Sequence, residues 1–167
     1  MVNSPTALSQ KYWISNGYNH ATHCLVFGQT IVRNKNEGVN AFLVPIRDAN
    51  KKVLPGVTVK DMGIKIGVNG VDNAVLRFDN VRIPRVNMMN KYCDVDSNGD
   101  FQSEYKRNTV RFFKVTERLL SGRICIAGIA MGGTRACLSI AIRYAQQRKS
   151  IGPEGLSTVP IMNYQLQ

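Results

Sequence analysis

The sequence predicts an α+β fold, in which an antiparallel β-sandwich or flattened barrel is followed by a long α-helix from an incomplete helical bundle. Residues 1–90 contain short runs rich in Val, Ile, Leu and Phe between turn signals, which is typical of an all-β unit. The 40 residues from Thr109 to Arg148 contain no proline and carry apolar residues at helical spacing. Between these regions, residues 91–107 predict a connecting hairpin.

The β-rich part is expected over residues 1–90, as a domain that is incomplete at its N-terminus. Its predicted strands are "CLVFGQTIV" (24–32), "NAFLVPI" (40–46), "VTVKDM" (57–62) and "NAVLRFDNVRI" (73–83). The turn signals "NKNEG" (34–38), "RDANKK" (47–52) and "LPG" (54–56) separate these strands.

The connection contains alternating acidic residues that partly match a calcium-binding loop. Asp94, Asp96, Asn98 and Gly99 meet the first four requirements of the template, but its twelfth position is Tyr105 instead of glutamate. Glu104 lies one residue too early, so the last two oxygen ligands are missing. We therefore expect a hairpin with Asn-Gly at its bend, with calcium binding as the alternative.

The helical part is expected over residues 108–167, as the truncated start of a C-terminal bundle domain. Glycines at 128, 132 and 133 would weaken an isolated helix, so we expect them to admit close approach of neighbouring helices. The helix is apolar on more than one side, which predicts that the isolated chain associates with itself. After the helix, "SIGPEGLSTVP" (150–160) predicts a loop and "IMNYQLQ" (161–167) the start of another element.

The net charge of +11 comes from 22 Lys and Arg against 11 Asp and Glu. These charges are scattered, whereas nucleic-acid binders cluster basic residues with aromatics, so nucleic acid is not an expected partner. A phosphate-bearing small ligand would suit the charge. No secretory signal and no uninterrupted apolar segment of about 20 residues is present, which favours an intracellular protein without a membrane span.

The metal-ligating residues are few. The four cysteines (24, 93, 125 and 137) are widely spaced and predict buried, reduced thiols, and the sequence has only two histidines. We expect no metal site.

Three stretches together resemble the acyl-CoA dehydrogenase and acyl-CoA oxidase superfamily. They are "KYWISNGYNHATHCLVFGQTIV" (11–32), "MGIKIGVNGVDNAVLRFDNVRIPR" (62–85) and "GRICIAGIAMGGTRACLSIAIRYAQQRKSIG" (122–152). "GVNGVDNAVLRFDNVRIPR", "SGRI" and the insertion before the helix are more similar to the oxidases, whereas "WISNG" is closer to the dehydrogenases. The resemblance implies a peroxisomal, FAD-dependent acyl-CoA oxidase of fatty acid β-oxidation, with an acyl-CoA dehydrogenase or a non-catalytic interaction module as alternatives.

In such an oxidase, a fatty acyl-CoA becomes a trans-2-enoyl-CoA and O₂ becomes hydrogen peroxide. The resemblance also implies residue roles. Trp13 matches an aromatic ring beside the isoalloxazine, and Ser15 a hydroxyl near flavin N5. Arg148 matches an arginine that reaches the FAD pyrophosphate of a neighbouring subunit, which implies a homodimer, and Gln165 a glutamine near the same FAD half.

Arg123 matches an arginine near the acyl-CoA site, with an ordinary ion-pair partner as its alternative. The catalytic glutamate is expected beyond Gln167, and an upstream flavin-binding segment before Met1, so the isolated chain is expected to be inactive.

Overall fold

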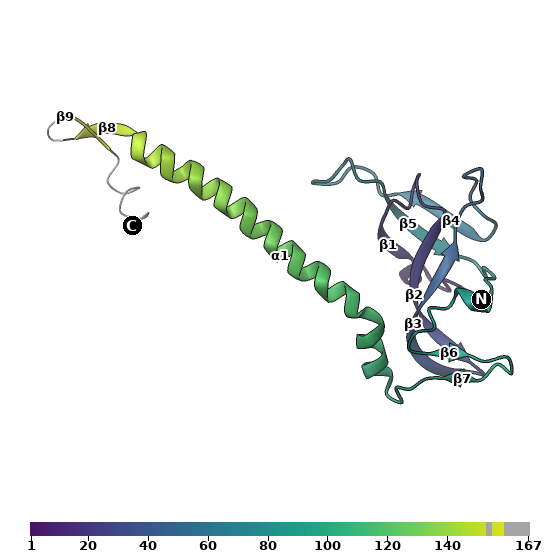
Figure 1. Cartoon of the computed structure of the whole chain (residues 1–167). Coiled ribbons are helices and arrows are strands. Elements are labelled where there is room, and N and C mark those ends of the chain that lie inside the picture. Colours follow the sequence, from purple (N-terminus) through teal and green to yellow (C-terminus); the bar gives the residue numbers. More distant parts are fainter. Residues whose placement is uncertain (153–154, 159–167) are drawn as a thin grey trace. The chain divides into compact units, whose positions relative to one another are not determined.

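The computed structural model describes residues 1–152 and 155–158, and the chain divides into two units, Met1–Val115 and Thr116–Gln167 (Figure 1). The strands of the first unit are β1 (Lys11–Ser15), β2 (His23–Val32), β3 (Lys35–Pro45), β4 (Val57–Asp61), β5 (Asn73–Phe78), β6 (Asp94–Val95) and β7 (Phe101–Gln102). Short 3₁₀ turns, η1 and η2, cover Ala7–Ser9 and Arg85–Asn87. The long helix α1 (Asn108–Gln147) passes from the first unit into the second, where β8 (Lys149–Gly152) and β9 (Gly155–Thr158) follow it.

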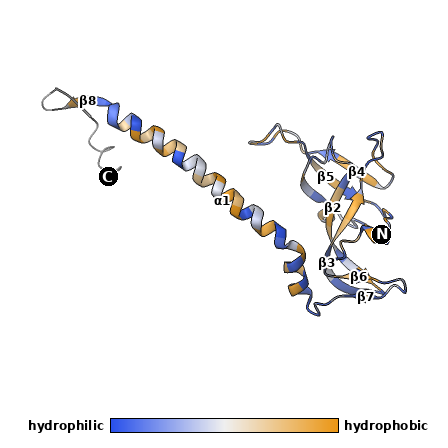
Figure 2. Cartoon of the chain, in the orientation of Figure 1, coloured by the Kyte–Doolittle hydropathy of each residue, from blue (hydrophilic) through white to orange (hydrophobic). Residues whose placement is uncertain are grey.

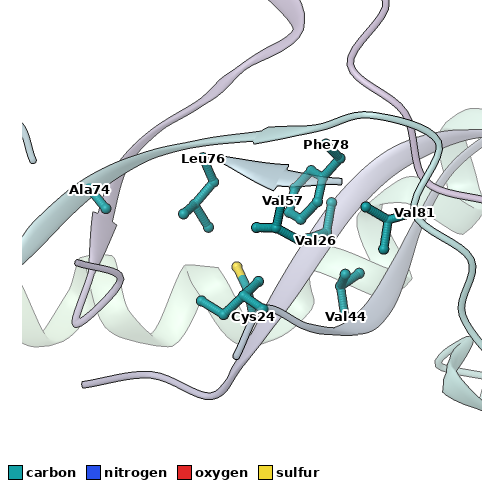
Figure 3. Close-up of a cluster of buried hydrophobic side chains, with 9 residues drawn as sticks. Cys24, Val26, Val44, Val57, Ala74, Leu76, Phe78 and Val81 are labelled. Atoms are coloured by element: carbon teal, nitrogen blue, oxygen red, sulfur yellow. The ribbon is translucent and has the colours of Figure 1, made fainter. Parts of the chain in front are cut away.

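Two antiparallel sheets form the core of the first unit. One has the order β1-β5-β4, and the other is the hairpin β2-β3. The residues that alternate toward the interior form one cluster from both sheets (Figure 3): Cys24, Val26, Val44, Ile46, Val57, Ala74, Leu76, Phe78 and Val81. Because no strand pairing joins the two sheets in the described part of the chain, the unit is a sandwich and not a closed barrel. The predicted α+β fold is confirmed.

The β2-β3 hairpin turns more tightly than the sequence predicts. Val32 pairs with Lys35, so only Arg33 and Asn34 form the loop, and both have positive φ (48° and 63°). Two consecutive residues with positive φ are typical of a type I′ turn, whose twist matches that of the flanking strands. The predicted turn at residues 34–38 is therefore wrong in its extent, because β3 already begins at Lys35.

The acidic connection folds as a hairpin, as predicted. Asp94 pairs with Gln102 and Val95 with Phe101, and Gly99 has the positive φ (81°) that the bend requires. The Asp96 carboxylate accepts hydrogen bonds from the backbone amides of Asn98 and Asp100 at 2.9 and 2.8 Å. These hydrogen bonds, first that from Asp100, hold the pKa of Asp96 below its ordinary value. The carboxylate thus stabilises the turn itself.

Arg111 joins the start of α1 to the sandwich. Its side chain is buried and donates to the backbone oxygens of Tyr105, at 2.8 Å, and Glu37, and to Asn108 Oδ1 at 2.7 Å. The guanidinium also lies over the Phe101 ring, 4.7 Å from its centroid. One side chain therefore links the tip of the β2-β3 hairpin, the β6-β7 hairpin and the first turn of the helix.

Helix α1 is confirmed over 40 residues, and its apolar side chains remain uncovered in this chain. Apolar and polar residues alternate around it along its length (Figure 2). Ile124, Ile129 and Ile140 are 74, 75 and 69% exposed. A Cβ at the glycines 122, 128, 132 or 133 would meet nothing within 4 Å, so the expected close helix neighbours are not supplied by the described residues.

The segment after α1 is not the loop that the sequence predicts. Lys149 pairs with Thr158 and Ile151 with Leu156, which makes β8 and β9 an antiparallel hairpin. Ile and Thr are favoured in strands, and Ser150 with Ser157 and Ile151 with Leu156 form cross-strand pairs. The element predicted at residues 161–167 lies outside the described residues.

The cysteines divide between the two units. Cys24 and Cys93 are buried, and burial raises the pKa of each thiol. Cys125 and Cys137 are exposed, so the prediction of four buried thiols is wrong for these two. The reason is that both lie on α1, whose surface has no covering partner here. All four are free thiols.

Helix α1 is also long and apolar enough to cross a membrane by length and composition alone, since its most apolar 18-residue window has a mean hydropathy of 1.6. None of that window is buried in this chain. The same composition suits an inner helix of a bundle, which is the role that the sequence predicts.

Candidate functional site: the bulged strand β1

Strand β1 carries a bulge at the tryptophan that the sequence singles out. Lys11 pairs with Leu76 and Ile14 with Ala74, so Tyr12 and Trp13 together lie opposite the single residue Val75. Trp13 has a positive φ of 62°, which is a strained backbone for a bulky residue. Its side chain is nevertheless 50% exposed. Backbone strain of this kind clusters at functional sites, which makes Trp13 a candidate ligand-binding residue.

Ser15 ends β1 beside this tryptophan, and it lies opposite Asn73 in the ladder. The exposed Ser15 hydroxyl accepts a hydrogen bond from Asn73 Nδ2 at 3.4 Å. Asn73 itself is buried, 1% exposed, at the start of β5. The hydroxyl thus has a buried partner on one side and an open side where a ligand acceptor can bind.

The loop after Ser15 is held by the carboxylate of Asp72. Asp72 accepts hydrogen bonds from the amides of Tyr18 and Asn19 at 2.8 and 2.7 Å, and from His20 through both its amide and its ring. Burial raises the pKa of Asp72, but the hydrogen bonds from Asn19, His20 and Tyr18 outweigh it and leave the pKa below its ordinary value. The charged carboxylate is therefore the form that holds the loop.

Arg47 holds the same loop through its carbonyl groups. The buried guanidinium donates to Gly17 O at 2.9 Å, to Ala21 O at 2.8 Å and to Tyr18 O. Gly17 fits tightly, because a Cβ there would lie 2.9 Å from Ala74 Cβ. One cation and one anion thus fix the carbonyls and the amides of a loop that directly follows Trp13 and Ser15. We call Asp72, Arg47 and residues 16–22 the loop clamp.

A pocket of about 320 Å³ lies beside the loop clamp. It is lined by Tyr18, Asn19, Arg47, Lys51, Val53 and Val59. Both of its cationic side chains already donate to backbone oxygens, Arg47 as above and Lys51 to His20 O at 2.9 Å. The positive charges of Arg47 and Lys51 therefore stabilise the loop.

The structure brings together two of the five predicted site residues, Trp13 and Ser15, on β1. The other two in the described part lie in the second unit. Arg123 lies on α1 and is exposed, and Arg148 follows α1 directly, with its amide bonded to Tyr144 O at 2.8 Å. Gln165 lies outside the described residues. Within residues 1–152 and 155–158, no group of His, Cys, Asp and Glu is placed to hold a metal ion.

Sequence reasoning missed the residues that support β1, namely Arg47, Asp72 and Asn73. Arg47 lies in "RDANKK", which predicts only a turn, and Asp72 and Asn73 lie in "GVDN", which contributes only to the family resemblance and to the start of a predicted strand. Asp and Asn are common in turns, so the pattern alone gives no reason to place them beneath a distant strand.

Comparisons with known proteins identify what this arrangement resembles. No family model matches the chain. The peroxisomal acyl-coenzyme A oxidase 3 of Arabidopsis thaliana is 44% identical over 161 residues, which are 93% of this chain and 24% of the relative. The crystal structure of acyl-CoA oxidase 3 from Yarrowia lipolytica matches with a TM-score of 0.84 at 30% identity, over 98% of this chain and 24% of that one.

A third relative is acyl-CoA oxidase-1 of Caenorhabditis elegans, solved in complex with FAD and ATP. It matches with a TM-score of 0.69 at 30% identity, over 94% of this chain and 23% of that one. The chain therefore spans about a quarter of the length of the relatives it matches.

Proposed function

The chain is related in sequence and in fold to the acyl-CoA oxidases, and we propose that it forms the flavin-facing β-unit and the first bundle helix of an FAD-dependent acyl-CoA oxidase. One observation of the structure carries the proposal beyond the resemblance. Trp13 is held half exposed in a strained, bulged backbone, with the exposed hydroxyl of Ser15 two residues further along the same strand. A flat aromatic wall beside a hydroxyl donor suits a flavin ring system.

The proposed reaction converts a fatty acyl-CoA and O₂ into the trans-2-enoyl-CoA and hydrogen peroxide. The substrate loses a proton from its α carbon and a hydride from its β carbon, and the C–C single bond becomes a double bond. When bound, FAD would supply the chemistry of hydride acceptance and of electron transfer to O₂. The α-proton goes to a carboxylate base that we expect beyond Gln167, so this part of the enzyme supplies binding and orientation.

Within that reaction, Trp13 provides the apolar wall and Ser15 donates a hydrogen bond to the flavin. Arg148 offers a fork of donors to the FAD pyrophosphate of a second subunit, and Gln165 contacts the same half. Arg123 lies near the acyl-CoA. These roles, the homodimer that Arg148 implies and a peroxisomal location follow from the family resemblance. The excess of positive charge suits the phosphates of both FAD and CoA.

An acyl-CoA dehydrogenase remains the alternative to test, since it differs from an oxidase in the electron acceptor and not in the first half-reaction. A non-catalytic interaction module is less well supported, because the relatives that this chain matches in sequence and in fold are named acyl-CoA oxidases. The uncovered surface of α1 is accounted for by the bundle of which this helix would form part.

The test uses the full-length protein that contains this chain. Purified protein is mixed anaerobically with a fatty acyl-CoA while flavin absorbance is followed, and O₂ is then admitted. Bleaching, rapid reoxidation and one peroxide per enoyl product are expected. Bleaching with slow reoxidation would indicate a dehydrogenase, and a protein without bound flavin would contradict both functions.

A further inference from the structure

We propose that Asn73 is a positioning residue that directs the hydrogen of the Ser15 hydroxyl toward the flavin. This inference rests on the proposed function, because it takes the flavin to bind beside Trp13 and Ser15. It adds a residue from a different strand, β5, whose side chain is buried beneath the site.

The geometry of the pair decides how the hydroxyl can bond. A serine hydroxyl has one hydrogen to donate and two lone pairs that accept. Asn73 Nδ2 donates to Ser15 Oγ, with 3.4 Å between the two atoms. This contact occupies a lone pair and leaves the hydrogen of Ser15 for an acceptor on its exposed side.

The orientation of the Asn73 amide decides which way the hydrogen of the Ser15 hydroxyl points. Asn73 Oδ1 is buried and has no hydrogen-bond partner in the part of the chain that the structure describes. If the amide were reversed, Oδ1 would lie next to the Ser15 hydroxyl and would accept its hydrogen, so none would remain for a ligand. The arrangement with an unpaired Oδ1 is the one in which Ser15 can donate outward. A buried oxygen without a partner is costly and often marks a functional position.

The backbone around the pair is fixed, so the amide and the hydroxyl keep their positions. Ser15 and Asn73 are directly opposite in the antiparallel ladder. The neighbouring Asp72 holds the loop after Ser15 through its carboxylate, and its backbone oxygen accepts from the Asn16 amide at 2.5 Å. Asp72 and Asn73 therefore act together, because the first fixes the end of β1 and the second sets the direction of the hydroxyl.

The experiment measures the rate of anaerobic flavin bleaching by a fatty acyl-CoA in the full-length holoenzyme. Asn73→Asp replaces the amide donor by a carboxylate of the same shape, which accepts the Ser15 hydrogen and turns it away from the flavin. We expect bleaching to slow about tenfold, since loss of one hydrogen bond to a developing charge has about that effect. Ser15→Ala should slow it by a similar factor, and Asn73→Asp should add nothing to Ser15→Ala. The visible spectrum of the flavin should shift in the same way in both single variants.

Asn40→Asp is the matched control. Asn40 is also fully buried, and its Nδ2 donates to a hydroxyl, Thr30 Oγ1, at 2.8 Å, but on the β2-β3 hairpin. It should leave the bleaching rate and the flavin spectrum unchanged. Asn73→Ala is a second variant that removes the amide without adding charge, and it too should have no further effect in the Ser15→Ala background.

Three outcomes would overturn the inference. Asn73→Asp could leave bleaching unchanged, or it could slow bleaching equally with and without the Ser15 hydroxyl. Both Asn73 variants could also lose flavin while Ser15→Ala keeps it, which would make Asn73 a structural residue. Failure of the proposed function is seen separately, because the unmodified protein would then bind no flavin or would not bleach.

Discussion

Arg111→Ala tests whether one side chain holds the start of α1 against the sandwich. The substitution removes the donors to Glu37 O, Tyr105 O and Asn108 Oδ1, and the stacking on Phe101. Without these contacts, the start of α1 and the two hairpins that it contacts should separate more often in local opening events. Arg111 does not contact the rest of the sandwich core, so the amides there should keep their protection against hydrogen exchange.

The size of the effect follows from these contacts. A hydrogen bond from a charged group contributes about 1.5 to 3 kcal/mol, and bonds from one group do not add fully. Arg111 Nε has no partner among the described residues, so only the terminal nitrogens count. We expect a loss of about 3 kcal/mol, which lowers the protection of local amides against hydrogen exchange about 100-fold.

The assay is hydrogen exchange of the full-length protein, read by mass spectrometry in peptides covering residues 94–115. Lys114→Ala is the control, because Lys114 lies less than one turn further along the same helix, has the same charge and is exposed. It should change exchange less than fivefold. Equal protection in Arg111→Ala and the unmodified protein, or an equal loss in Lys114→Ala, would refute the role of Arg111.

Three further predictions concern the loop clamp and the acidic hairpin. Asp72→Asn should lower stability at pH 7 by about 2 kcal/mol in urea unfolding. Because the folded pKa of Asp72 is depressed, its stabilisation is fully present above the ordinary pKa of an Asp, about 3.9, and is lost as the pH falls through the folded value, so the difference should begin to shrink below about pH 4. A stability difference that does not decrease at all as the pH falls below about 4 would contradict this. Gly17→Ala should cost about 1 to 3 kcal/mol because its Cβ meets Ala74, whereas Gly28→Ala, in open space, should cost less than about 1 kcal/mol. Calcium should leave the Tm unchanged, since the Asp96 carboxylate already binds the turn amides, and a rise in Tm with calcium would show a metal site.

The sequence predicted the larger elements because their signals are local. The 40-residue helix has no proline to end it, and strands β2 and β5 follow runs whose apolar residues alternate into the core. These local signals failed where the ends of a strand or turn depend on which strands pair with each other. The β2-β3 turn is shorter than its polar residues suggest, and the hairpin after α1 was predicted as a loop because its proline and glycine residues are turn signals.

The candidate site was predictable only in part. Trp13 and Ser15 were predicted because they lie in one stretch that resembles a known family. Asn73 and Asp72 are more than 50 positions away from them in the chain, and strand pairing alone brings them beneath β1. The bulge at Trp13 has no sequence signal either, since neither glycine nor asparagine occupies the position with positive φ.

The central claim is that β1 faces the flavin of an acyl-CoA oxidase. A crystal structure of the full-length protein with its bound flavin tests this most directly. We predict that the Trp13 ring lies in van der Waals contact with the isoalloxazine and that Ser15 Oγ lies about 2.7 to 3.2 Å from a flavin nitrogen or oxygen. A flavin bound out of reach of both side chains would contradict the claim.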